Sequence, residues 1–409
     1  MANISPFPAL RYASGPLEPL VCPPYDIISP QEEEALLRRH PHNIIRLEKP
    51  RDYAEAADTL RQWLDRRVLQ LDDAPSYYLY QEEFTVNGRK MSVSGLMADL
   101  KLEPFSAGVV LPHEETLAKA RGDRHALLSA CRCNFSPIYC LYIDKERAAA
   151  SILDQIKATR PDLEITTDDG IVHRLWRASR AETASALSAA FAPKTVYIAD
   201  GHHRYNTALQ FHQEQNLPET SRVMALLCDM DDPGLVIWPT HRVLAGLPDF
   251  SLDKAMKALE KNFSIEAAGE EALGAIDRKH TVGLYAEGRA YLLTLRNQAA
   301  PAEAMPDKSK AYQSLDVALL HSLILKPVFG IDTAQPEAQA YLTYTRSAQE
   351  ALDSVANGAQ CAFFLGATTM AQLAAVSAAG ERMPQKSTYF YPKLITGLVM
   401  KMLRPEDQR

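Results

Sequence analysis

The stretch Thr195-Val-Tyr-Ile-Ala-Asp-Gly-His-His-Arg-Tyr-Asn-Thr-Ala-Leu209 has the pattern of a buried strand, a tight turn and a helix. Its first residues are β-branched or aromatic, which favours a pleated and buried segment. Gly201 ends this strand, and the apolar residues that follow are spaced as in a helix. The sequence therefore predicts a strand-turn-helix unit, with His202, His203 and Arg204 in the first helical turn or just before it.

This turn has the composition of a phosphate-binding site. The first turn of a helix leaves backbone N–H groups unpaired and carries a partial positive charge, so anions bind there. Arg204 adds a guanidinium that can hold two phosphate oxygens in a fork, and His202 and His203 add two imidazoles. The role of Asp200 stays open, because its carboxylate could orient a histidine, hold a metal ion, accept a proton or simply cap the helix.

The run Asp200-Gly-His-His-Arg-Tyr, together with Ala208, resembles the signature of domain-of-unknown-function family 1015 (DUF1015), and this resemblance covers nearly the whole chain. The same run is similar to the phosphate-binding motif of ParB/sulfiredoxin-type free serine kinases. The second resemblance implies a ParB/sulfiredoxin-like phosphate-binding core. It also implies that the motif holds the phosphates of a donor, while an upstream carboxylate activates the serine hydroxyl.

Length and composition limit the classes of function. A chain of 409 residues exceeds what one hydrophobic core usually spans, which favours two domains. The formal net charge of −7 argues against a broad electrostatic surface for nucleic acid, so no nucleic-acid partner is expected. No apolar stretch reaches the length of a membrane span, and the cysteines lack paired metal-binding spacing. We expect a cytoplasmic protein with a small-molecule substrate, and a homodimer only on general frequency.

Alternating strand and helix patterns predict an α/β fold (α+β, with mixed sheets). Asn87-Gly88 between two strand-like runs is a strong hairpin signal, whereas residues 148–192 look helical with a hairpin-like interruption near Asp168-Asp169-Gly170. We expect an N-terminal α/β domain over residues 1–245, which carries the strand-turn-helix unit. A second α/β domain is expected over residues 246–409, with a loop that returns to the cleft of the first.

Asp26 follows Pro23-Pro-Tyr25, where two prolines force an extended path, and it lies in a short turn before a helix. Ser29 and Glu32 form an S-x-x-E capping box for that helix, so the Asp26 carboxylate can be held in a fixed direction. Asp26 could equally serve only to form the turn. The segment resembles the Pro-Pro-Tyr-Asp motif of DUF1015, which implies that Asp26 belongs to a site.

A second block, from His113 to Ser136, is crowded with charged groups. A surface run of charges would explain this pattern as well. The order of its residues resembles a second block of DUF1015, and this resemblance implies that Glu114 is a catalytic carboxylate. It also implies binding roles for His113, Thr116, Asp123, Arg124 and Asn134.

A third block, Met383-Pro-Gln-Lys-Ser-Thr-Tyr-Phe-Tyr-Pro-Lys393, contains prolines that stiffen its backbone. Lys386, Ser387 and Thr388 therefore lie on a rigid loop, where ammonium and hydroxyl groups can meet phosphate oxygens. An ordinary surface loop is the alternative. The block is similar to a DUF1015 pattern, which implies that these residues and Lys393 bind phosphate or substrate.

The carboxylates, imidazoles and cations of these blocks suit phosphoryl transfer, which needs charge neutralisation, an aligned attacking oxygen and often Mg²⁺. We hypothesise a kinase, a phosphotransferase that acts on a small hydroxylated metabolite. The resemblance to free serine kinases implies free L-serine as acceptor and O-phospho-L-serine as product, with ATP, ADP or pyrophosphate as donor. Standard nucleotide motifs such as the P-loop are missing, which makes pyrophosphate a donor to test.

The resemblance implies Glu114 as the general base, with Asp26 as the second choice. Asp200 and His203 are further candidates for proton transfer, while Gly201, His202 and Arg204 would bind phosphate. The metal ligands stay unassigned. General-base action contributes roughly 10²–10⁴-fold to a rate, so loss of the true base should remove most activity.

Three alternatives remain. A phosphohydrolase would use the same anion site and let water attack. A ParB-like regulatory protein would bind nucleotide as a switch, although the acidic balance of the chain disfavours DNA binding. A metal hydrolase built on His113, His202 and His203 is disfavoured, because these residues lack an H-x-H or H-x-x-x-H ligand spacing.

Overall fold

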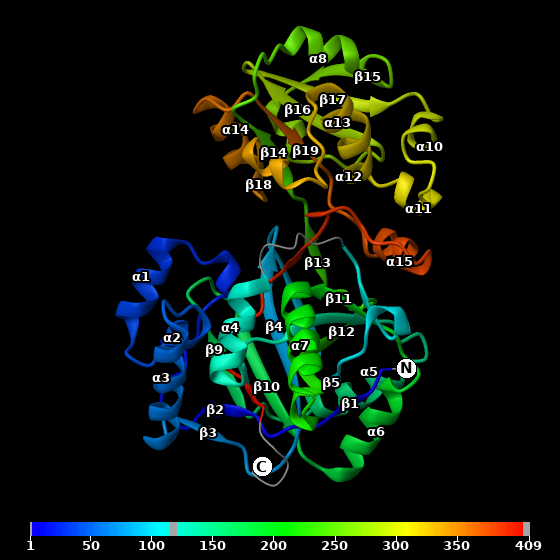
Figure 1. Cartoon of the computed structure of the whole chain (residues 1–409). Helices are drawn as coiled ribbons and strands as arrows, with labels where there is room; N and C mark the ends of the chain where they lie inside the picture. Colours follow the sequence, from blue (N-terminus) through cyan, green and yellow to red (C-terminus); the bar gives the residue numbers. More distant parts are fainter. Residues whose placement is uncertain (1, 115–120, 404–409) are drawn as a thin grey trace. The chain divides into compact units, whose positions relative to one another are not determined.

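A computed structural model describes residues 2–114 and 121–403, and the chain divides into two compact units (Figure 1). Unit 1 comprises Met1–Pro112, Ala118–Leu235 and Pro392–Arg409. Unit 2 comprises His113–Leu117 and Val236–Tyr391. Unit 2 is therefore inserted into the sequence of unit 1, and the last segment of the chain returns to unit 1.

A nine-stranded mixed sheet forms the centre of unit 1. Its strands are β1 (Ile4–Ser5), β4 (Tyr77–Val86), β5 (Arg89–Lys101), β6 (Val110–Pro112), β8 (Ile138–Tyr142), β9 (Leu163–Thr166), β10 (Val172–Ala178), β11 (Val196–Asp200) and β12 (Arg222–Asp229). They follow the order β6-β11-β8-β12-β5-β4-β10-β9, with β1 paired to β5. β11 is parallel to β6, and β12 is parallel to β8. The predicted hairpin is confirmed, because β4 and β5 meet at Asn87-Gly88, whose φ angles are 50° and 76°.

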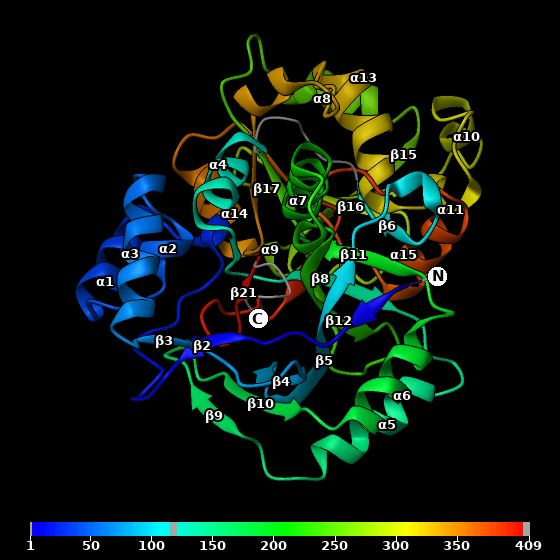
Figure 2. The ribbon, with the colours of Figure 1, turned by 60° about the horizontal axis from the view of Figure 1, so that its bottom comes forward.

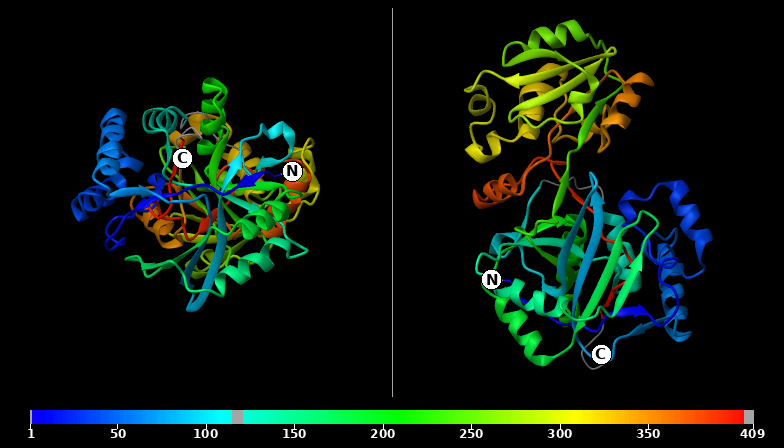
Figure 3. Two further views of the ribbon diagram at one scale, coloured as in Figure 1. Left: turned by 90° about the horizontal axis from the view of Figure 1, so that it is seen from below. Right: turned by 180° about the vertical axis from the view of Figure 1, so that it is seen from behind.

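Helices accompany this sheet. They are η1 (Tyr25–Ile27), α1 (Pro30–Arg39), α2 (Ile45–Glu48), α3 (Tyr53–Asp65), η2 (Phe105–Ala107), α4 (Arg121–Cys131), α5 (Ala148–Lys157), α6 (Ala181–Phe191), α7 (His202–Gln215) and η4 (Pro218–Thr220). The predicted capping box of α1 is present, since Ser29 and Glu32 bond reciprocally. α4 and α7 lie side by side (Figure 1), and α5 and α6 form a second pair (Figure 2). The group α1 to α3, drawn in blue, lies apart from that second pair in both views of Figure 3.

The hairpin-like interruption expected near Asp168-Asp169-Gly170 is confirmed by the antiparallel pair of β9 and β10, and it occupies more of the range 148–192 than expected. α5 and α6 form the two ends of this range, and β9 and β10 lie between them. β10 pairs with β4 on one side and with β9 on the other, and His173, Leu175 and Trp176 are buried there. The distant partner β4 therefore decides that this segment is a strand.

Apolar clusters of buried residues fill the described part of unit 1. The first packs against the central sheet and includes Leu96, Ile198 and Phe211. The second joins the group α1 to α3 with α4, and includes Trp63 and Leu127. Because this second cluster also contains the residues that precede Glu48, it fixes the end of α2 beside α4.

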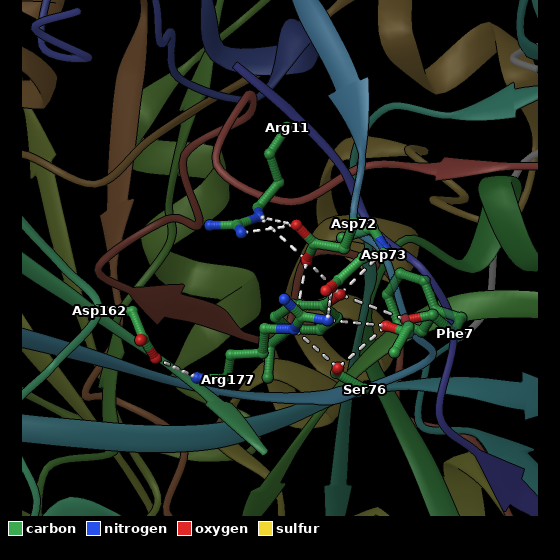
Figure 4. A network of polar contacts seen from close by, with 10 residues as sticks. Phe7, Arg11, Asp72, Asp73, Ser76, Asp162 and Arg177 are labelled. Atoms are coloured by element: carbon green, nitrogen blue, oxygen red, sulfur yellow. Dashed lines mark hydrogen bonds and ion pairs between the residues drawn. The ribbon is translucent and has the colours of Figure 1, made fainter. Parts of the chain in front are cut away.

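A polar network at one edge of unit 1 ties distant segments together (Figure 4). β2 (Leu10–Tyr12) and β3 (Leu69–Leu71) form a short sheet, and Asp72 directly follows β3. Oδ1 of Asp72 lies 2.6 Å from Nη2 of Arg11 in β2. Arg177 of β10 bonds Asp73, and its Nε donates to Ser76 at 2.9 Å. The network thereby joins the short β2-β3 sheet to the edge of the large sheet.

Unit 2 is built on a six-stranded antiparallel sheet of order β15-β17-β16-β19-β14-β18. Its strands are β14 (His241–Leu244), β15 (Phe263–Ala268), β16 (Thr281–Ala286), β17 (Arg289–Leu295), β18 (Leu342–Thr345) and β19 (Cys361–Phe364), and a separate ribbon pairs β13 (Val236–Trp238) with β20 (Tyr389–Tyr391). Its helices are α8 (Leu252–Leu259), α9 (Glu270–Leu273), α10 (Ala300–Ala304), α11 (Lys310–Gln313), α12 (Asp316–Leu319), the π-helix η5 (Leu320–Leu325), α13 (Lys326–Phe329), η6 (Pro336–Ala340), α14 (Ala348–Ala356) and α15 (Met370–Ala378).

Both units combine helices with β-sheet, so the predicted α/β class with mixed sheets is confirmed. In the part of the chain that the structure describes, no helix combines the length and the apolar composition that a membrane span requires.

Candidate functional site

The predicted strand-turn-helix unit is confirmed, because β11 ends at Asp200 and α7 begins at His202. Gly201 forms the turn with a φ of 87° and a ψ of 25°, a left-handed conformation that glycine adopts at little cost. A Cβ atom at this position would lie 3.1 Å from Nε and Nη2 of Arg204, which is closer than ordinary contact. The missing side chain therefore allows the Arg204 guanidinium to lie over the turn.

Asp200 lies between two cations. Its Oδ2 is 2.6 Å from Nζ of Lys393, and its Oδ1 is 4.0 Å from Nη2 of Arg204. The N–H of Gly201 donates to Oδ1 at 2.7 Å. Burial by itself raises the pKa of Asp200, but Lys393 and Arg204 outweigh it and hold the pKa well below its usual range. Asp200 is thus ionised and holds both cations in place, which makes it a poor proton acceptor.

The two cations are largely buried, since 15% of the Arg204 side chain and 12% of the Lys393 side chain are exposed. Nη1 of Arg204 also donates to the carbonyl of Pro137 at 2.6 Å. Both cations thus share Asp200 at the N-terminus of a helix of 14 residues. The first N–H groups of such a helix carry partial positive charge, so the turn favours an anion.

His202 is buried and His203 is half-buried in the first turn of α7. His113, the third member of the metal-site alternative, belongs to unit 2. The residues that the structure describes contain no group of three or more His, Cys, Asp or Glu side chains that could hold a metal ion.

Arg124 is the centre of a second polar group in unit 1. Its guanidinium lies 3.9 Å from the centroid of the Tyr25 ring. Its Nε donates to Asp123 at 2.6 Å, and Asp123 also accepts from the Tyr53 hydroxyl at 2.6 Å. Nη1 of Arg124 donates to the carbonyl of Glu48 at 2.8 Å. Arg124 thereby holds η1 against the end of α2.

Asp26 is exposed within η1 and lies close enough to Arg204 to interact electrostatically. Asn134, which is half-buried, accepts a hydrogen bond from the backbone N–H of Met224 at 3.2 Å. The fold of unit 1 therefore brings the Asp26 carboxylate near the turn at Asp200, although the two carboxylates are far apart in sequence.

Glu48 is a residue of this group that the sequence did not reveal. It is 1% exposed, and its Oε1 accepts from the Ser136 hydroxyl at 2.9 Å and lies 3.9 Å from Nη1 of Arg124. Burial raises the pKa of Glu48, although Arg124, Arg204 and Ser136 act in the opposite direction. The available signal was a carboxylate that directly follows the mostly apolar run 44–47.

The other predicted site residues form a group within unit 2. Nε2 of His113 lies 2.6 Å from the Thr388 hydroxyl and 3.6 Å from the Glu114 carboxylate. Ser387 is buried and bonds the carbonyl of Pro384, and Lys386 has a positive φ of 57°. Thr116 lies outside the described residues.

Arg242 supports this loop from inside unit 2. Its side chain is fully buried, and Nη2 donates to the carbonyls of Lys386 at 2.9 Å and Gln385 at 3.3 Å. Burial lowers the pKa of Arg242 to about 10. Burial also holds the pKa of His321 well below its usual value, so His321 is neutral there, as expected for a core histidine.

A protein-family model and several solved structures are similar to this chain. A family model described as "Protein of unknown function (DUF1015)" matches residues 4–318. A solved structure of a free serine kinase mutant with AMP is similar, with a TM-score of 0.40 and 12% identity, over 75% of this chain and 92% of that chain. No curated protein matches.

Two further solved structures are similar. A conserved hypothetical protein from Pyrococcus furiosus has a TM-score of 0.37 and 14% identity, over 76% of this chain and 95% of that chain. C-terminally truncated SbnI from Staphylococcus aureus has a TM-score of 0.37 and 12% identity, over 75% of this chain and 90% of that chain.

Proposed function

The chain belongs to the DUF1015 family, whose description names no activity, and we propose that it is a phosphotransferase that acts on a small hydroxylated metabolite. The observation that carries the proposal is the pair of cations, Arg204 and Lys393, that share Asp200 at the first turn of α7. We propose free L-serine as acceptor and O-phospho-L-serine as product, since the Asp200-Gly-His-His-Arg run resembles the motif of free serine kinases.

In the proposed reaction, the phosphates of the donor lie over the first turn of α7. Backbone N–H groups and the Arg204 fork hold the oxygens, and Lys393 neutralises charge on the transferring phosphoryl group. Asp200 stays ionised and keeps both cations in position. His202 and His203 supply further polar contacts at the same turn. We propose ATP, ADP or pyrophosphate as donor.

Phosphoryl-transfer sites often bind Mg²⁺ through one or two carboxylates together with the donor phosphates. We propose that Mg²⁺ is bound in the same way here. Asp200 is engaged by two cations and Glu48 is buried, whereas Asp26 is exposed and interacts with Arg204. Asp26 is therefore the residue that would hold the ion. When bound, the ion would neutralise charge on the phosphate oxygens.

The proposal is tested by phosphorus NMR of the purified protein with Mg²⁺, L-serine and each of ATP, ADP and pyrophosphate in turn. Phosphoserine should appear with one of these donors. Release of inorganic phosphate at the same rate without serine would replace the kinase by the phosphohydrolase. If the phosphorus spectrum does not change with any donor, the proposed function fails.

Arg204→Lys tests the role of Arg204 in phosphate binding, because lysine keeps the positive charge but lacks the planar guanidinium that can bind two oxygens at once. We expect a fall in kcat of roughly 10²-fold, as for loss of one preorganised donor to a transition state. Arg180→Lys is the control, since Arg180 is exposed at the start of α6 and its side chain makes no cap. Near-normal turnover in Arg204→Lys would rule out the phosphate role of Arg204.

A further inference from the structure

A small cavity of about 50 Å³, lined by both polar and apolar side chains, lies beside Arg204 within unit 1. Its polar lining residues are Glu48, Arg124, Asn134, Ser136, Arg204 and Thr207. They come from α2, α4, α7, β7 (Cys133–Asn134) and the segment between β7 and β8. Arg204 thus contributes both to this cavity and to the turn at Asp200, which makes the two features neighbours.

Thr207 is the residue that points to a ligand in the cavity. It follows Arg204 by three positions on α7, so both side chains lie on one face of the helix. Thr207 is 2% exposed, and among the described residues its Oγ1 has no hydrogen-bond partner. Buried hydroxyls are almost always hydrogen-bonded, so a polar group that enters the cavity would supply the missing partner.

Glu48 presents a carboxylate to the same cavity. Its Oε1 is occupied by the Ser136 hydroxyl at 2.9 Å, whereas no described residue donates a hydrogen bond to its Oε2. The Asn134 amide also lines the cavity, and its Oδ1 accepts from the Met224 backbone, so its NH₂ group is the part that can donate. The cavity therefore offers an acceptor, a donor and a hydroxyl within a volume that suits only a small group.

We propose that this cavity receives the hydroxymethyl end of the phosphoryl acceptor, that Thr207 and Asn134 orient the hydroxyl, and that Glu48 accepts its proton. This inference rests on the proposed phosphotransferase function. The acceptor oxygen loses its proton to Glu48 and bonds to the terminal phosphorus of the donor, whose bond to the leaving phosphate oxygen breaks. The proton then leaves from Glu48 to solvent or to the released phosphate. Glu48 takes here the role otherwise predicted for Glu114.

The surroundings of Glu48 suit a proton acceptor, because together they raise its pKa above the ordinary value of a glutamate. The charged and titratable groups that interact with it are Cys22, Tyr25, Asp26, Arg124 and Arg204. The two arginines favour the carboxylate, whereas burial and Asp26 favour the protonated form, and the net effect is a raised pKa. The small volume of the cavity sets a further expectation. An acceptor with a primary alcohol should be preferred over one with a bulkier secondary alcohol, because the cavity holds only a small group.

The first experiment measures steady-state kinetics of Glu48→Gln, Glu114→Gln and Thr207→Val with the donor and acceptor found by phosphorus NMR. For Glu48→Gln we expect a fall in kcat of roughly 10²–10⁴-fold with an unchanged KM for the donor, and loss of the acidic limb of the pH profile. Thr207→Val should raise the KM for the acceptor by roughly tenfold. Near-normal kcat in Glu48→Gln, or a greater loss in Glu114→Gln, would overturn the inference.

Glu82→Gln is the matched control. Glu82 is also 1% exposed in unit 1, and burial raises its pKa to about 8, but it does not line the cavity. We expect Glu82→Gln to keep normal kinetics, which separates loss of a buried carboxylate from loss of the proton acceptor. Equal loss of activity in Glu82→Gln and Glu48→Gln would indicate a general effect on folding and would overturn the inference.

A second experiment needs no turnover. A pyrophosphate ion at the Asp200 turn adds negative charge near Glu48 and should raise its pKa, so binding should take up a proton. Calorimetry of pyrophosphate binding in two buffers of different ionisation enthalpy measures this uptake, which should be present in the wild type and absent in Glu48→Gln. If no donor and acceptor react but this difference is found, the proposed function fails while Glu48 remains coupled to the anion site. If the uptake is unchanged in Glu48→Gln, the inference fails.

Discussion

At the scale of single residues, Asp200 predicts a pH-dependent contribution to stability. Its pKa lies well below the usual range in the folded chain, because Lys393 and Arg204 outweigh the effect of burial. The contribution is therefore fully present above the ordinary Asp pKa of about 3.9 and is lost as the pH falls toward the lower folded value. We expect Asp200→Asn to lower the free energy of unfolding by about 3 kcal/mol near neutral pH, because two largely buried cations lose their counter-charge.

Urea unfolding of wild type and Asp200→Asn at a series of pH values checks this. The difference in the free energy of unfolding between wild type and Asp200→Asn should stay constant down to a pH of about 5 and shrink below a pH of about 4. Asp154→Asn removes a pair with Arg147 in which 51% and 68% of the side chains are exposed, and it should change stability by less than about 1 kcal/mol. A deficit of the same size in acid would mean that Asp200 acts through its hydrogen bonds and not through its charge.

At the scale of elements, the strand-turn-helix unit depends on the backbone conformation of Gly201. We expect Gly201→Ala to destabilise unit 1 by about 1–2 kcal/mol, because a side chain is strained at positive φ. The new Cβ atom would also displace the Arg204 guanidinium, so pyrophosphate binding should weaken by roughly tenfold or more. Calorimetric titration with pyrophosphate and urea unfolding measure the two effects.

Gly170→Ala separates strain from contact. Gly170 has a similar φ of 80°, but a Cβ atom there would meet nothing within 4 Å. It should show the same loss of stability with normal pyrophosphate binding. Equal weakening of binding in both variants would contradict the role given to the turn.

Local sequence patterns were sufficient where a structure depends on neighbours in the chain. The Asn87-Gly88 hairpin, the capping box at Ser29 and the helix start at His202 belong to this class. The hairpin-like interruption near residues 168–170 is also local, whereas the pairing of β10 with β4, which is distant in sequence, was not predicted. Glu48 was missed for the same reason, since its importance comes from Arg124 and Ser136, which the second apolar cluster brings to it.

At the scale of the molecule, unit 1 is completed by the end of the chain. Lys401, in β21 (Lys401–Met402), is buried and bonds the buried Asp99 of β5, while β21 pairs with β7. We expect Lys401→Met to lower the stability of unit 1 by about 3–5 kcal/mol, because Asp99 keeps a buried charge without this cation. Unfolding followed by the fluorescence of Trp176, in a variant that keeps only this tryptophan, measures the effect.

Unit 2 provides an internal reference for this measurement. Trp238 belongs to unit 2, and its fluorescence transition, followed in a second variant that keeps only Trp238, should stay unchanged in Lys401→Met. Lys101→Met, which removes an exposed pair with Glu103, should change the Trp176 transition by less than about 1 kcal/mol. If both transitions move together, the two units unfold as one, and the separate stabilities assumed here do not exist.

Because the ribosome makes Asp200 before Lys393, the anion site is completed only some time after its first residues have been synthesised. Asp200 and Lys393 are 193 positions apart. At about 5–20 residues per second, translation needs on the order of 10–40 s to span that interval. During this time the nascent chain carries the turn at Gly201 without the lysine that neutralises its carboxylate. The turn therefore acquires its second cation only after Lys393 has been synthesised, well after Asp200.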